Sequence, residues 1–247
     1  MEVAHRKNNI RDEIIRIAGP VFIEVLMGTL FGMVDMIMLG NFGDDATSAA
    51  GIAAVGVTNQ LVFIGLSLVQ SLNIGATAMV ARYIGAKRED RIESVVKHII
   101  ILTQLFLVVP LLILGLGFSS QVMKFLGAHQ DTMAVGMSYF RVIIIGFIFQ
   151  AFNFSIFAAM RGAGDTKTPM KINITVNLLN VFGNAVLIYG LLGFPSFGVT
   201  GVAISTALSH VIASIMLVIY IFKKDSSIHI NLKNKFKVDK DIVYNLV

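Results

Sequence analysis

The chain has 247 residues, of which 55% are hydrophobic and 14% are charged. Ordinary soluble domains carry about 25% charged residues, so this composition excludes a typical soluble protein. The net charge of +5 comes from basic residues scattered over short segments, which argues against a nucleic-acid-binding protein, and the lack of Cys excludes disulfides and Cys-ligated metals.

Charged side chains are absent from four long runs, at residues 46–81, 98–123, 142–160 and 172–222. A membrane-spanning helix needs about 20 mainly apolar residues. The first three runs therefore hold one span each, and the last holds two, divided by the turn GFPSFG. The segment 14–39 adds another span. The sequence predicts an all-α integral membrane protein with helices at about 14–40, 52–82, 96–118, 134–160, 169–191 and 199–222.

The first predicted helix carries two acids in apolar surroundings, Glu24 and Asp35. At about 100° per residue both fall in one narrow sector together with Gly28 and Gly32. Two small residues four positions apart allow another helix to approach closely, so Asp35 should face protein. An ionised Asp in mid-membrane costs roughly 2.5–3.5 kcal/mol, which indicates a functional reason for its presence.

The fifth predicted helix bears a single stripe of four amides. Its members are Asn173, Asn177, Asn180 and Asn184. Other helices add polar residues that include Gln70, Asn153 and Thr206. These side chains could simply form interhelical hydrogen bonds, each worth roughly 0.6 kcal/mol. The combination of the Asp35 face with the amide stripe favours a hydrated pathway instead, where a carboxylate among amide and hydroxyl oxygens suits Na⁺ coordination or proton exchange. We expect Gln70, Asn153 and Asn177 to line its cavity.

Basic residues fall on alternate connections between the predicted helices. Eighteen of the 20 Lys and Arg residues lie on one side. By the positive-inside rule this side is the cytoplasm, so both termini are expected there, in a multi-pass protein of the cell (inner) membrane. We divide the chain into a cytoplasmic N-terminus (1–13), a six-helix lobe (14–222) and a cytoplasmic linker (223–247) whose end DIVYNLV suggests the start of a further helix.

The segment RGAGDTKTP does not match a phosphate-binding loop, since no strand precedes it. It suits a tight turn, with Asp165 or Thr166 placed to cap the following helix. No catalytic cluster or metal-ligand spacing stands out, so we do not expect an enzyme.

Four stretches together resemble the first lobe of multidrug and toxic compound extrusion (MATE) transporters. They are GPVFIEVLMGTLFGMVDMIMLG, GLSLVQSLNIGATAMVARYIGAKR, YFRVIIIGFIFQAFNFSIFAAMRGAGDTKTPM and LLNVFGNAVLIYGLLGFPSFGVTGVAISTALS. The resemblance covers about residues 14–222. It implies an antiporter without a cofactor that exports organic, cationic compounds in exchange for Na⁺ or H⁺, by alternating access between two six-helix lobes.

The resemblance also assigns roles to single residues. It places the coupling acid at Asp35, where Na⁺ would bind, and the helix-bending proline at Pro20. The partners of the acid would be Asn180, Asn184 and Thr206. Some branches of the family have Asp where this chain has Asn184, so a mechanism that needs two acids in this lobe is in doubt.

The family has twelve helices, and this sequence supplies six. We expect a fragment or truncated gene product whose second six-helix lobe is missing, with a homodimer as the alternative. Two other functions stay open. One is a flippase for lipid-linked saccharides, although Arg141 is the one basic candidate within a span. The other is a transport-inactive remnant or subunit.

Overall fold

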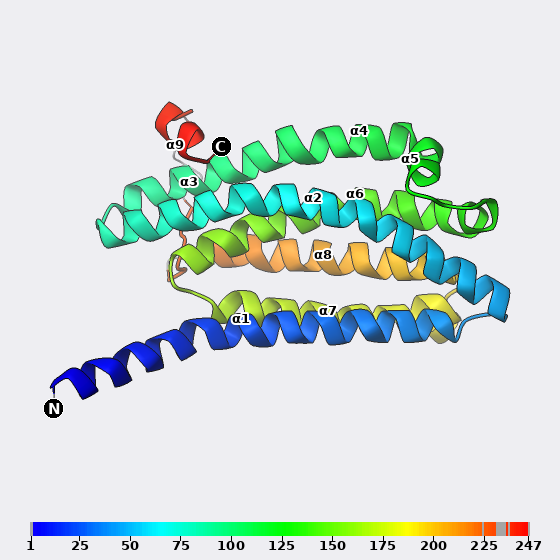
Figure 1. The fold of residues 1–247 in the computed structure, drawn as a ribbon, viewed down its shortest axis with the longest axis horizontal. Helices are drawn as coiled ribbons and strands as arrows, with labels where there is room; N and C mark the ends of the chain where they lie inside the picture. Colours follow the sequence, from blue (N-terminus) through cyan, green and yellow to red (C-terminus); the bar gives the residue numbers. More distant parts are fainter. Residues whose placement is uncertain (1, 224, 231–235, 237, 247) are drawn as a thin grey trace.

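The computed structural model describes residues 2–223, 225–230, 236 and 238–246, and within these residues every regular element is a helix (Figure 1). The elements are α1 (Glu2–Gly40), α2 (Asp45–Gly85), α3 (Glu89–Leu102), the π-helical segment η1 (Thr103–Val108), α4 (Val109–Gly117), α5 (Ser119–Phe125), α6 (Gln130–Gly162), α7 (Lys167–Tyr189), the 3₁₀ segment η2 (Leu191–Gly193), α8 (Val199–Ile221) and α9 (Lys240–Leu246).

Six helical stretches are long and apolar enough to cross a membrane, which confirms the predicted fold class. They are Ile14–Gly40, Asp45–Gly85, Asp90–Gly117, Gln130–Gly162, Lys167–Tyr189 and Val199–Ile221. α1 begins at Glu2, so the segment expected as a separate N-terminus continues the first helix. The second helix starts earlier than expected, because the Asp44 side chain accepts a hydrogen bond from the Thr47 N–H at 2.9 Å and caps it.

The third span is not the single regular helix that the sequence predicts. A π-helical turn, η1, separates α3 from α4, and the N–H of Val109 bonds to the carbonyl of Gln104. The next residue, Pro110, has no N–H to continue the normal pattern of hydrogen bonds. A change in hydrogen-bond register just before a proline accommodates this missing donor.

α2, α6 and α8 form the centre of the bundle, and α1 lies along α7 at one side (Figure 1). The core contains fully buried aromatic side chains of α6, including Phe147 and Phe157. Close approach of the helices depends on small residues. A Cβ added to Gly146 of α6 would lie 3.0 Å from the Cβ of Ala207 in α8. This contact brings α6 and α8 together beside the cavity described below.

The RGAGDT turn connects α6 to α7 through Asp165. Its carboxylate accepts a hydrogen bond from the Thr168 N–H at 3.0 Å and others from the hydroxyls of Tyr220 at 2.8 Å and Ser227 at 3.2 Å. Thr166 holds the N-cap position of α7 but its side chain makes no capping bond, and the side chain of Asp165 supplies that bond instead. Burial would raise the pKa of the Asp165 carboxyl, but these hydrogen bonds outweigh burial and lower the pKa below its ordinary value.

Asp165→Ala should destabilise the lobe by about 1 kcal/mol at neutral pH, the usual cost of losing a helix cap. Because the folded-state pKa is lowered, the carboxylate stabilises the fold above its unfolded pKa of about 3.9 and loses this effect as the pH falls through the folded value. Thermal unfolding in detergent at pH 7 and pH 3 checks both points. The difference between parent and variant should shrink at pH 3; an equal difference at both pH values would contradict the capping role.

Part of the C-terminal segment packs against the bundle. Ile228 and Ile230 are buried in a cluster that includes Ile99 of α3, and α9 adds Ile242 to the same cluster. His98 accepts a hydrogen bond from the Asp239 N–H at 2.9 Å. Hence the described part of the segment expected as a linker forms buried contacts with the lobe, and it contains a short helix close to where DIVYNLV suggested one.

Candidate functional site

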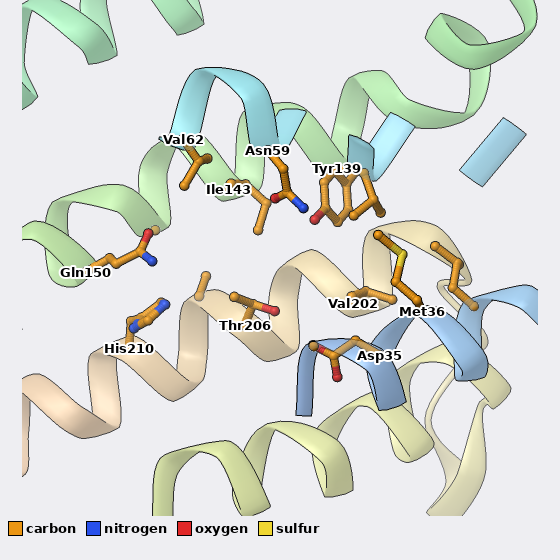
Figure 2. A pocket seen from close by; sticks show the side chains of 15 residues that line it. Asp35, Met36, Asn59, Val62, Tyr139, Ile143, Gln150, Val202, Thr206 and His210 are labelled. Atoms are coloured by element: carbon orange, nitrogen blue, oxygen red, sulfur yellow. The ribbon is translucent and has the colours of Figure 1, made fainter. Parts of the chain in front are cut away.

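A cavity of about 160 Å³ opens between four helices in the middle of the bundle (Figure 2). Its lining residues are Gly32, Asp35, Met36 and Leu39 of α1; Val55, Asn59 and Val62 of α2; Tyr139, Ile143, Gly146 and Gln150 of α6; and Val202, Thr206, Ala207 and His210 of α8. Figure 2 shows Asp35 and Tyr139 toward one end and Gln150 and His210 toward the other. The cavity is therefore apolar in most of its wall and polar at a few points.

The Asp35 carboxylate lies between the cavity and the amide stripe of α7. The amide nitrogen of Asn184 donates a hydrogen bond to Asp35 Oδ1 at 2.6 Å. Asn184 is fully buried, and Asp35 is half-buried. The structure thus brings together Asp35 and Asn184, two residues that lie far apart in the sequence.

Asn180 joins the same group through the orientation of its amide. With the nitrogen turned toward α1, it donates to Asp35 Oδ1 at 3.2 Å, while its oxygen accepts from the Thr206 hydroxyl at 3.2 Å and the Thr206 N–H at 3.1 Å. This orientation satisfies both ends of the amide, whereas the opposite one leaves the oxygen facing other acceptors. Asn180 therefore connects the carboxylate of α1 to the hydroxyl of α8.

The amide oxygen of Asn184 is buried and has no hydrogen-bond partner among the described residues. An unpaired buried oxygen is unfavourable unless a donor or a cation occupies the space beside it. This oxygen belongs to the same amide that bonds Asp35. A carboxylate and a neighbouring carbonyl-type oxygen are the ligands that hard cations prefer.

The charge of the cavity wall has one sign. Asp35 is its one acidic residue, and neither Lys nor Arg lines it. Among the residues that the structure describes, no basic side chain forms an ion pair with Asp35. Nor do three His, Asp or Glu side chains of this part of the chain come together to hold a metal ion. The wall therefore suits small cations and protons better than transition metals.

The three residues expected to line the cavity lie elsewhere. Asn153 is buried, where it donates to the His210 carbonyl at 2.9 Å and accepts from Ser214 at 2.7 Å. Asn177 of α7 and Gln70 of α2 are half-buried and are not among the lining residues. Asn153 therefore fits the alternative of interhelical hydrogen bonding. Pro20 lies inside α1, which continues through it.

Tyr139 was not expected in the cavity, although the sequence contained a signal for it. Tyr139, Ile143, Gly146 and Gln150 have the same spacing along α6 as the four asparagines have along α7. Such spacing places side chains on one face of a helix.

Comparison with known proteins agrees with this arrangement. The family model MatE matches residues 20–186. A probable multidrug resistance protein NorM of Thermotoga maritima is 32% identical over 220 residues, which cover 87% of this chain and 45% of that protein. The multidrug export protein MepA of Staphylococcus aureus is 25% identical over 87% of this chain and 46% of its own length. The chain thus spans about half the length of these relatives.

Solved structures show the same lobe. A multidrug resistance MATE transporter of the MOP superfamily in an outward-facing conformation superimposes with a TM-score of 0.81 and 30% identity, covering 95% of this chain and 50% of that one. A MATE structure described as bent gives a TM-score of 0.82 with 28% identity. The match of the family model over most of the lobe, and the agreement with these structures, show that this chain belongs to the MatE family of multidrug and toxic compound extrusion transporters.

Proposed function

We propose that this chain forms one lobe of a secondary active antiporter that exports organic cations in exchange for Na⁺ or H⁺. The observation that carries the proposal is the contact of Asp35 with Asn184 and Asn180 at the edge of a cavity that neither Lys nor Arg lines. An unbalanced carboxylate in this position attracts any small cation that can reach it.

The coupling would work through this contact. A cation or proton on Asp35 changes the charge that the amides of Asn180 and Asn184 face, and so changes the free energy of packing α1 against α7. A bound ion shifts a conformational equilibrium only if its affinity differs between the two states. Thr206 would take part because its hydroxyl and N–H hold the amide of Asn180.

The organic substrate would be cationic, because the charged side chain in the cavity wall is an acid. A flippase for anionic lipid-linked saccharides would need basic residues there. Arg141, the candidate for such a residue, is exposed and donates a hydrogen bond to Ser119 at 3.4 Å instead of lining the cavity. The NorM and MepA relatives are named as multidrug resistance and multidrug export proteins, which also supports the export of organic compounds.

The complete transporter would need a second six-helix lobe, supplied by further sequence or by a second copy of this chain. Both termini would lie in the cytoplasm, as the distribution of Lys and Arg indicates.

Asn184→Asp should make the site respond to Na⁺. The change places a second carboxylate 2.6 Å from Asp35 Oδ1, where the amide nitrogen now lies, and two carboxylates so close bind either a shared proton or a metal cation. Thermal unfolding in detergent at pH 8, with NaCl compared against choline chloride, measures this. The variant should gain more stability from Na⁺ than the parent; equal responses would show that Asn184 does not contribute to an ion site.

The function is tested by uptake of ethidium, an organic cation, into everted membrane vesicles of cells that express the gene at its native locus, because movement into an everted vesicle corresponds to export from the cell. A pH jump and a Na⁺ jump are applied separately. We expect one of the two gradients to drive ethidium movement in the direction that corresponds to export. No response to either gradient would contradict ion-coupled export.

A further inference from the structure

α1 is attached to α7 by two similar bonds. Asn173 donates to Glu24 Oε1 at 2.6 Å, and Asn184 donates to Asp35 Oδ1 at 2.6 Å. Glu24 and Asp35 are separated by as many residues as Asn173 and Asn184, which is about three helical turns. The two helices therefore run in the same direction and share one register, with a carboxylate–amide bond at each end of the shared segment.

The two bonds differ in the balance of charge. Arg161, in the last turn of α6, lies 2.7 Å from Glu24 Oε1, and the side chains of Arg161 and Glu24 are only 25% and 10% exposed. The described residues provide no such cation for Asp35, whose hydrogen-bond partners are neutral amides. Breaking a buried ion pair leaves an uncompensated charge and is strongly unfavourable, whereas an amide–carboxylate contact has no opposite charge to lose.

The cluster of Glu24, Asn173 and Arg161 also connects α1 to the centre of the bundle. It joins α1 to α7 through Asn173 and to α6 through Arg161, and α6 itself packs against α2 and α8. The Asp35 bond joins α1 to α7 and borders the cavity. Thus α1 has two attachments. The charges at Glu24 are balanced within the protein, whereas the charge at Asp35 must be balanced by a cation from outside.

We propose that Glu24 is a positioning residue for transport: with Arg161 and Asn173 it anchors α1 permanently, so that a change at Asp35 moves only the part of α1 between Glu24 and Gly40. This inference rests on the proposed role of Asp35. The anchor turns the loss of one hydrogen bond into a local displacement next to the cavity instead of a shift of the whole helix.

Spin-label distances in nanodiscs test the anchor, and the absence of native Cys makes labelling simple. An inner pair, Phe22→Cys with Ile101→Cys, reports the position of α1 before Glu24. An outer pair, Ile37→Cys with Ile113→Cys, reports its far end; all four native side chains are exposed. Each pair is measured in the parent, in Asp35→Ala, in Glu24→Ala, in Arg161→Ala and in Asp90→Ala. The last is the matched control, because Asp90 pairs with Arg88 at 3.2 Å on the exposed surface.

We expect Asp35→Ala to change the outer distances and leave the inner ones unchanged. Glu24→Ala and Arg161→Ala should each broaden or shift the inner distances, while Asp90→Ala should leave them as in the parent. Circular dichroism of each variant shows whether the helices persist, and Arg161→Ala gives a second route to the same result if Glu24→Ala folds poorly.

Two results would overturn the anchor: inner distances that move in Asp35→Ala, or inner distances that stay unchanged in both Glu24→Ala and Arg161→Ala. Because these measurements involve no transport, they separate the anchor from the proposed function. Outer distances that stay unchanged in Asp35→Ala would argue against the proposed role of Asp35, and the inner distances in the Glu24 and Arg161 variants would still decide whether the anchor exists.

Discussion

Asp35→Asn is expected to remove most of the ion-dependent export while the lobe still folds. The Asn side chain has nearly the same shape, and its oxygen can still accept the hydrogen bond that Asn184 now donates at 2.6 Å. What disappears is the negative charge that binds the coupling cation in the proposed mechanism. Coupling between sites is typically about 1–3 kcal/mol, so ion-stimulated efflux should fall by roughly 5- to 150-fold. The ethidium assay with everted vesicles measures it.

The control for this variant is Asp45→Asn. Asp45 lies exposed in the first turn of α2, away from the lining residues of the cavity, so the substitution makes the same change in net charge without touching the site. We expect parental efflux from it at equal protein level. Parental efflux from Asp35→Asn, with the ion gradient still required, would show that another group carries the coupling.

Gly162→Ala is expected to give the largest loss of stability. Gly162 ends α6, and a Cβ added there would lie 2.5 Å from the carbonyl oxygen of Thr77 and 3.0 Å from the Cβ of Val80. A carbonyl oxygen in the backbone of α2 cannot move aside as a flexible side chain can. Relieving the overlap would push α6 away from α2, and such overpacking costs about 1–3 kcal/mol. Thermal unfolding in detergent should show a midpoint several degrees lower.

Gly56→Ala serves as the matched substitution. Gly56 is exposed on α2, and a Cβ there would meet no atom within 4 Å. In a helix, Ala is more favourable than Gly by about 1 kcal/mol, so this variant should be as stable as the parent or slightly more stable. If Gly162→Ala were equally harmless, the contact between α2 and α6 would be looser than the structure shows.

The sequence alone determined the fold class and the number of spans. In hydrocarbon, every backbone polar group must be satisfied within its own helix, so the length and apolarity of a segment are enough to identify it as a span. The same reasoning found the acid and the amide stripe, because buried polar side chains are costly there and must face protein. This reasoning did not predict the π-helical turn before Pro110, because a proline indicates a disturbed helix but not the kind of disturbance.

Only the tertiary structure decided which polar residues meet. Spacing places Asn177 on the same stripe as Asn180 and Asn184, yet the last two alone reach Asp35. Likewise, Asn153 bonds to α8 and does not line the cavity, while Tyr139 lines it. Periodicity tells which face of its own helix a side chain occupies. Periodicity does not tell which neighbouring helix this face meets, or which residues of that helix lie opposite it. Both depend on how closely helices from distant parts of the chain approach each other, and the small residues at their crossings decide this.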